Sequence, residues 1–300
     1  MIWHNLHTAI LQWYSQSARD LPWRHTRDPY AILVSEVMLQ QTQVDRVLPK
    51  YLAFLAQYPD FRTLAAAPTS EVIRTWQGLG YNRRAVRLQR VAQAVVQRYD
   101  GALPDSMPAL LELEGIGRYT AAAVACFAFG RAEPVLDTNV RRVLGRIALG
   151  PDGPATATPA ALWALAKEAL PDSDPYSWNQ ALMDLGARIC MERNPMCLVC
   201  PARSGCASAG RAVPALREQR GSYKTKREAP FAGSTRFYRG RIIERLRLLG
   251  PAETLPLSAI GASIKPDYAA SDEPWLQGLI QGLEHDGLLA TREDGGIALP

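Results

Sequence analysis

Apolar residues recur at intervals of three and four along the chain from its start to about residue 209, which is the spacing of amphipathic helices. The alternation of apolar and polar residues that is typical of strands is not found in this part. The pattern predicts an all-helical body, with one long apolar helix over 29–47 and an arginine-rich helix over 83–99. Glycine and proline mark the gaps between helices, at Pro59, Pro68, Gly78, Gly101, Pro104 and Gly130.

The composition changes after Cys206, where glycine, serine, arginine and lysine become frequent through Tyr223. This change predicts a linker over 211–230, which follows a helical domain over 1–215. The remaining chain predicts helices over 235–249, near Ser258 and over 273–285, and then two short extended segments on either side of an Asp-Gly-Gly turn. We therefore expect a small winged-helix-like α+β module over 231–300.

Length and composition describe an ordinary globular protein of 300 residues, 47% of them hydrophobic. The apolar residues do not form an uncharged run of about 18 or more, and the start of the chain, with His4 and His7, lacks the layout of a signal peptide. We expect a monomeric cytoplasmic protein without a membrane partner. In that compartment thiols stay reduced, so the five cysteines argue against a disulfide framework.

The net charge of +5 is a weak indication of a polyanionic partner, because many proteins with a mild basic excess bind no nucleic acid. Its distribution is more informative. Residues 221–300 are neutral in sum, although their first part, 221–247, is basic. The whole excess therefore belongs to residues 1–220, and a DNA-binding surface is expected there.

Four cysteines form the strongest motif, because they follow one another as C-x6-C-x2-C-x5-C at Cys190, Cys197, Cys200 and Cys206. Four thiolates in one loop enclose either a [4Fe–4S] cluster or a zinc ion. Structural zinc sites usually contain two close pairs, and only one C-x2-C pair is present, which favours the cluster. Cys126 stands alone in an apolar run and is expected to be a core residue.

A second motif is the segment 113–120, Leu-Glu-Gly-Ile-Gly-Arg-Tyr-Thr, which leads into an alanine-rich helix. Gly115 and Gly117 allow the backbone to approach a phosphate closely, and the free N–H groups at a helix start bind phosphate. The segment is similar to a helix-hairpin-helix. An ordinary connection between two helices would also explain it.

Two carboxylates are candidates for catalysis. Asp137 lies between an apolar pair and the basic run of a following helix, where it could be an N-cap and could also stay ionised to stabilise a cationic sugar. Glu36 is the charged residue of an apolar segment, so burial would raise its pKa and make it a general acid, unless it faces water on an amphipathic helix. A shielded acid and an ionised carboxylate are the usual equipment for cleaving a glycosidic bond.

These features together resemble the helix-hairpin-helix, endonuclease III-like DNA glycosylase superfamily, and within it the adenine DNA glycosylase (MutY) branch. The resemblance covers about residues 10–210. It implies a two-lobed fold, with a six-helix lobe over about 22–132 and a cluster lobe formed by 1–21 and 133–210. The matching segments are Leu21 to Arg24, Ser35 to Val44, Gly78 to Tyr81, the hairpin, Leu136-Asp137 with Asn139-Val140, and Asn179 to Gly186.

The resemblance implies catalytic roles for four residues. Glu36 would protonate N7 of adenine, and Asp137 would stabilise or briefly capture the sugar cation, with Tyr119 and Asn139 in support. Relatives that nick DNA carry a lysine at position 119 to form a Schiff base, which a tyrosine does not form. A monofunctional glycosylase with a [4Fe–4S] cluster, acting on mismatched double-stranded DNA in base excision repair, is therefore expected.

The resemblance also implies contacts with the base and the duplex. Arg19, Arg24 and Asp184 would approach the extruded adenine. For the two arginines, the alternative is that they are ordinary surface residues. Leu39, Gln41 and Tyr81 would wedge into the base stack, because extrusion of a base costs stacking energy that protein contacts must replace. The expected set of substrate and DNA contacts is Arg19, Trp23, Arg24, Leu39, Gln41, Thr42, Tyr81, Gly115, Gly117 and Asp184.

Three departures from the family pattern stand out. Glu114 replaces a proline that is common in the hairpin, and Asn82 replaces an aromatic residue that often follows Tyr81. Residues 220–300 are also too short and too helical for the NUDIX-like domain that reads 8-oxoguanine. Two alternatives therefore stay open. One is a thymine or uracil mismatch glycosylase of the same fold, although the segment Gln40 to Gln43 argues against it. The other is a non-catalytic DNA-binding protein.

Overall fold

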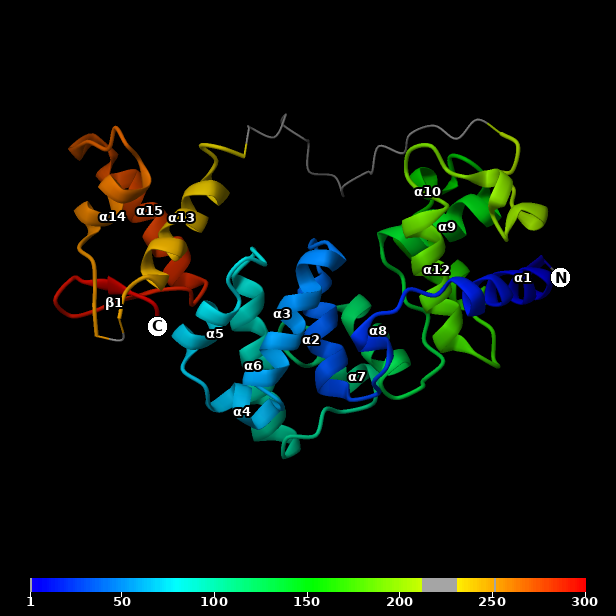
Figure 1. Ribbon diagram of the computed structural model, residues 1–300, viewed down its shortest axis with the longest axis horizontal. Coiled ribbons are helices and arrows are strands. Elements are labelled where there is room, and N and C mark those ends of the chain that lie inside the picture. The colour runs from blue at the N-terminus through cyan, green and yellow to red at the C-terminus, as the bar shows by residue number, and fades with distance from the viewer. Residues whose placement is uncertain (1, 212–230, 251) are drawn as a thin grey trace. The chain divides into compact units, whose positions relative to one another are not determined.

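The computed structural model describes residues 2–211, 231–250 and 252–300. Residues 212–230 of the predicted linker lie outside the described residues. The described chain divides into two compact units, one with residues 2–33, 104–112 and 116–211 and the other with residues 34–103, 113–115 and 231–300 except 251. Figure 1 labels most of their α-helices and strand β1, and each unit is described by itself. The predicted division into a 1–215 domain and a 231–300 module stays a prediction.

Several helices of the first unit pack around one apolar core. Leu6 and Ile10 of α1, Val143 of α9, and Leu182 and Leu185 of α12 are almost completely buried in it. The helices of this unit are α1 (Ile2–Ser17), η1 (Pro22–Arg24), α7 (Met107–Leu111), α8 (Arg118–Phe127), α9 (Thr138–Leu149), α10 (Gly153–Thr156), α11 (Pro159–Glu168), α12 (Pro175–Arg188), η2 (Cys197–Val199) and η3 (Arg203–Gly205). Helix α2 (Pro29–Leu39) begins in this unit and ends in the second.

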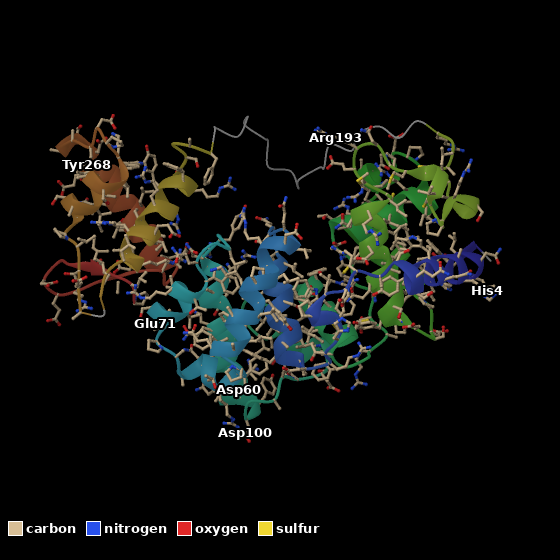
Figure 2. All side chains as sticks on the ribbon, viewed as in Figure 1. His4, Asp60, Glu71, Asp100, Arg193 and Tyr268 are labelled. Atoms are coloured by element: carbon tan, nitrogen blue, oxygen red, sulfur yellow. The ribbon has the colours of Figure 1, made fainter. Side chains whose placement is uncertain are left out.

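The second unit joins the middle of the chain to its C-terminal part. Helix starts follow ordinary capping chemistry: Asp60, labelled in Figure 2, accepts a hydrogen bond from the Thr63 amide at 2.7 Å at the start of α4. The elements of this unit, besides the end of α2, are α3 (Val44–Gln57), α4 (Phe61–Ala66), α5 (Thr69–Thr75), α6 (Arg83–Tyr99), α13 (Thr235–Arg247), α14 (Leu257–Ile264), η4 (Ala270–Asp272), α15 (Glu273–His285), β1 (Ala290–Thr291) and β2 (Ile297–Ala298).

The C-terminal part, residues 231–300, contains the three expected helices and the closing hairpin, whose strands pair antiparallel with Thr291 opposite Ile297. The ring of Tyr268, labelled in Figure 2, lies so close to Gly261 that a Cβ there would be about 2.4 Å from it. We call residues 231–300 the C-terminal module. Its description as winged-helix-like stays a prediction.

The helical prediction for the first 209 residues is confirmed, because in the described part of the chain the only strands are β1 and β2. One element differs: the single helix expected over 29–47 is two helices, α2 and α3, separated by residues 40–43. The apolar pattern continues through the break, so periodicity alone does not reveal it. No helix among the described residues is long and apolar enough to cross a membrane.

Candidate functional site

Glu36 lies in α2 and is buried, with 5% of its surface exposed. Its neighbours on the helix, Val34, Ser35 and Val37, are also buried. The alternative in which Glu36 faces water on an amphipathic helix is therefore wrong. A carboxyl group shielded from water in this way is suited to act as a general acid.

Arg84 of α6 holds the end of α2 and the break that follows it. Its Nη1 donates hydrogen bonds to the carbonyl oxygens of Val37, Met38 and Gln40 at 2.9, 2.8 and 2.6 Å. Its Nη2 donates to Oγ1 of Thr42 at 2.9 Å. The last carbonyls of a helix have no partner within the helix, and this buried guanidinium supplies one, so α2 ends at this point.

The same guanidinium also holds the loop before α6, because Nη2 donates to the carbonyl oxygens of Leu79 and Gly80 at 3.1 and 3.2 Å. Arg84 thus joins the two loops that contain the predicted wedge residues Gln41 and Tyr81. Burial lowers the pKa of Arg84 to about 10, so the side chain remains charged at neutral pH. The sequence pattern predicts only an arginine-rich helix here and gives no sign of this role.

The two loops present the wedge candidates at the surface. Gln41 and Tyr81 both have left-handed backbone conformations, with φ of 55° and 46°, which residues other than glycine adopt at a cost. Tyr81 is 45% exposed, Gln41 is exposed and Leu39 is partly buried. Thr42 is partly buried, and its Oγ1 accepts the hydrogen bond of Arg84. Strain of this kind, held in place by a buried arginine, is typical of a functional loop.

Asp137 is the N-cap of α9, as predicted. Its Oδ1 accepts a hydrogen bond from the Val140 amide at 2.6 Å, and its Oδ2 accepts one from Nδ2 of Asn139 at 3.1 Å. Asn139 is oriented in turn by Arg142, whose Nη2 donates to Oδ1 of Asn139 at 2.8 Å. The contact between Asn139 and Asp137 agrees with the expected supporting role, and Arg142 is a residue that sequence analysis missed. Tyr119 lies half-buried in the first turn of α8.

The pKa of Asp137 differs in direction from the expectation. Burial raises it above its ordinary value, and this effect outweighs the hydrogen bonds of Val140 and Asn139 and the charge of Arg142, which lower it. The helix N-terminus therefore does not by itself lower the pKa of this carboxyl group below its ordinary value. A carboxylate ionised in such a place attracts a nearby cation more strongly than one in water does, because the local dielectric constant is low.

The predicted hairpin consists of α7, a tight connection and α8. Gly115 has φ of +100°, a conformation that suits glycine, and Gly117 is the N-cap of α8. A Cβ at Gly117 would meet no atom within 4 Å, so the surface there is open. The start of α8 therefore has open space beside Gly117 for an anion, which is compatible with the hairpin prediction.

Asp184 of α12 is completely buried and binds two arginines. Arg19 Nε lies 2.7 Å from Oδ1, and Arg24 makes a bidentate pair with distances of 2.8 and 2.9 Å. Burial raises the pKa of Asp184, but the hydrogen bond and charge of Arg24 outweigh it, and the net pKa lies below the ordinary value. Arg24 is therefore not a plain surface arginine, and neighbouring Trp23 is also buried. In this arrangement Asp184 holds the arginines and presents no surface to a base.

Asp184→Asn is expected to lower the free energy of unfolding by about 3–5 kcal/mol, because it leaves the charge of Arg24 buried without its partner. A lowered pKa means that the carboxylate stabilises the fold above its unfolded pKa and loses this effect as the pH falls through its folded pKa. Urea titration of the variant should therefore show less acid sensitivity than the wild type. Asp105→Asn, which breaks an exposed ion pair with Arg131, is the control and should cost about 1 kcal/mol or less.

The four clustered cysteines line one small cavity, together with residues of α9 and α12. In residues 2–211, 231–250 and 252–300, no group of three or more His, Cys, Asp or Glu side chains is arranged to hold a metal ion. Arg146 lines the same cavity and is 1% exposed; its Nη1 lies 3.5 Å from Sγ of Cys190, and its Nε has no hydrogen-bond partner. Cys126 lies apart and is completely buried, as predicted.

Comparison with known proteins gives the family. Residues 34–168 match HhH-GPD, described as "HhH-GPD superfamily base excision DNA repair protein". An adenine DNA glycosylase of Mycolicibacterium smegmatis is 39% identical over 97% of this chain and 94% of its own. A thymine/uracil-DNA glycosylase of Methanothermobacter thermautotrophicus is 37% identical, over 67% of this chain and 91% of its own.

One solved structure is also similar to the chain. The structure of a thermostable thymine-DNA glycosylase matches 67% of this chain and 93% of its own, with 36% sequence identity and a TM-score of 0.63. The mycobacterial relative differs from these in that its similarity extends over 97% of this chain, whereas the thymine/uracil-DNA glycosylase matches 67% of it. The chain therefore belongs to the adenine DNA glycosylase family of the HhH-GPD superfamily of base excision DNA repair proteins.

Proposed function

We propose that the protein is a monofunctional DNA glycosylase that hydrolyses the N-glycosidic bond of adenine mispaired with 8-oxoguanine or guanine in double-stranded DNA. The observation that carries the proposal is the burial of Glu36, an acid shielded from water on a helix of this superfamily. The choice of adenine rests on the relative that is similar along nearly the whole chain. We expect the protein to act as a monomer in the cytoplasm.

The proposed reaction divides the work between two carboxyl groups. Glu36 donates its proton to N7 of the extruded adenine, and the electron pair of the glycosidic bond then leaves with a neutral base. The sugar is left as an oxocarbenium-like cation, which ionised Asp137 stabilises or briefly captures. A water molecule then adds to the anomeric carbon and loses a proton, which leaves an abasic site. Asn139 holds Asp137 in the required orientation through its 3.1 Å hydrogen bond.

Tyr119 determines the subtype in this proposal. A lysine at this position would attack the sugar carbon, form a Schiff base and lead to strand cleavage. A phenol forms no Schiff base, so the reaction stops after the base has been released. The DNA product should therefore be an intact strand with an abasic site that breaks only after treatment with alkali.

Binding of the duplex and of the extruded base is assigned to three groups of residues. The N–H groups at the start of α8, beside Gly115 and Gly117, would bind the DNA backbone. Leu39, Gln41 and Tyr81 would enter the base stack from the two loops held by Arg84. Arg19 and Arg24, fixed by Asp184, would face the extruded base.

A [4Fe–4S] cluster is proposed at Cys190, Cys197, Cys200 and Cys206. Two observations support it: the four thiols line one cavity, and the buried guanidinium of Arg146 beside them would be balanced by an anionic occupant. When bound, the group would cross-link the loop 190–206 and supply no step of base excision. Arg146 would then orient this loop through its hydrogen bonds to the carbonyl oxygens of Met191 and Glu192.

Purified protein is expected to be brown, with a broad visible absorption band and with iron and sulfide in equal amounts. Cys197→Ser should lose the band, whereas Cys126→Ser, which changes a cysteine outside the cavity, should keep it. A colourless protein that contains one zinc ion would contradict the cluster.

A thymine or uracil mismatch glycosylase is the second candidate, and the similarity to the thymine/uracil-DNA glycosylase and to the thymine-DNA glycosylase structure favours it. One assay decides. The protein is incubated with duplexes that contain A opposite 8-oxoG, A opposite G, T opposite G or U opposite G, and alkaline cleavage is measured. Cleavage at adenine is expected; cleavage at thymine or uracil alone would support the second candidate, and no cleavage would support a DNA-binding protein without activity.

A further inference from the structure

The C-terminal module lies against helices α5 and α6 of the same unit and contacts them through both apolar and polar groups. Ile73 and Val86 share one hydrophobic cluster with the buried residues of α13, α14 and α15. Arg74 donates hydrogen bonds to the carbonyl oxygens of Arg247 and Leu249, the second at 2.7 Å. The module is thus fixed beside the loop that precedes α6.

Arg247, at the end of α13, connects the module directly to that loop. It is 7% exposed, and its Nε and Nη2 donate to the carbonyl oxygen of Ile73 at 3.1 and 2.8 Å. Its Nη2 also donates to Oδ1 of Asn82 at 3.0 Å. Asn82 is the position where the family often has an aromatic residue, and here its amide oxygen receives a hydrogen bond that an aromatic ring would not accept.

Arg236, at the start of α13, contacts the neighbouring residue of the loop. Its Nη1 donates to the hydroxyl of Tyr81 at 3.1 Å, and its guanidinium carbon lies 5.9 Å from the centre of the Tyr81 ring. Arg84 lies 5.6 Å from the centre of the same ring. Tyr81 is therefore held by two arginines, one of which comes from the module.

We propose that the C-terminal module positions the wedge residue Tyr81: Arg247 fixes Asn82, Arg236 fixes the Tyr81 hydroxyl, and the strained loop is thereby held ready for insertion before DNA binds. The inference rests on the proposed function, because it takes Tyr81 as the wedge. Its physical basis is that Tyr81 has a left-handed backbone conformation and an exposed ring. Without the contacts from the module, it would sample other backbone and side-chain conformations. Arg236 is in this view a positioning residue, because it acts on the DNA only through Tyr81.

Arg236→Ala tests the proposal in the free protein and in the reaction. Hydrogen–deuterium exchange of the amides of 79–82 should become about threefold faster or more, because the loop opens more often. Single-turnover excision of adenine opposite 8-oxoG should fall about three- to tenfold. Asn82→Ala should have effects of the same kind without removing a charge. In the Tyr81→Phe background, which lacks the hydroxyl, Arg236→Ala should change the rate less than twofold.

Arg241→Ala is the matched control, because Arg241 also lies exposed on α13 but donates to the Ser263 carbonyl within the module. It should leave exchange of 79–82 and excision unchanged. Equal effects of Arg241→Ala and Arg236→Ala, or unchanged exchange in both Arg236→Ala and Asn82→Ala, would overturn the proposal. Faster exchange in a protein that excises no adenine would instead contradict the proposed function and leave the positioning intact.

Discussion

Glu36→Gln is expected to lower the single-turnover rate of adenine excision by about 10²–10⁴-fold, because it removes the proton that makes adenine a neutral leaving group. Glutamine has nearly the same shape and stays uncharged, so the buried site in α2 should remain intact. The rate is measured with enzyme in excess over a duplex that contains adenine opposite 8-oxoguanine, and binding is measured with the same duplex.

Duplex affinity should stay within a few-fold of the wild type in this variant, since Glu36 is not among the proposed contacts with the DNA backbone. Glu293→Gln, an exposed glutamate in the closing hairpin, controls for the loss of one negative charge and should excise adenine normally. A Glu36→Gln variant with an almost normal rate would show that another group protonates the base.

Asp137→Asn is expected to lower the excision rate by about 10²–10³-fold, because the neutral amide no longer stabilises the sugar cation. Binding of the duplex should again be retained, since the hairpin and wedge contacts are unchanged. Weakened binding as the main effect would argue against the assigned role. Asp152→Asn, which neutralises an aspartate at the start of α10 whose side chain makes no capping bond, is the control.

The raised pKa of Asp137 adds a pH dependence and a change in stability to this prediction. Excision requires the ionised carboxylate, so the rate should fall as the pH decreases through the folded pKa, which lies above the ordinary aspartate value. Above that pKa the buried charge destabilises the fold, and below the unfolded pKa this cost disappears. At neutral pH, Asp137→Asn should therefore be more stable than the wild type in urea titration.

Local chemistry in the sequence was sufficient to predict several features of the site. The burial of Glu36 follows from the apolar residues around it in α2, and the N-cap role of Asp137 follows from the helix-forming segment behind it. Both depend on residues within a few positions of each other, which is the range over which periodicity and capping act.

Features that depend on distant residues were missed. The end of α2 at Leu39 depends on Arg84, more than forty residues away, whose side chain binds the carbonyls of Val37 and Met38. Arg24 and Asp184 form their ion pair across 160 residues. The burial that raises the pKa of Asp137 likewise comes from tertiary packing, whereas the helix N-terminus, which is visible in the sequence, acts in the opposite direction.

The central proposal is that Glu36 and Asp137 act together on one nucleotide. The two residues belong to different compact units. A crystal structure of the protein with a duplex that carries a cationic azasugar in place of the adenosine, opposite 8-oxoguanine, tests it most directly. We predict an Asp137 carboxylate oxygen within about 3.5 Å of the ring nitrogen, and Glu36 on the face where the base would leave. A complex in which either carboxyl group faces away from the extruded sugar would contradict the account.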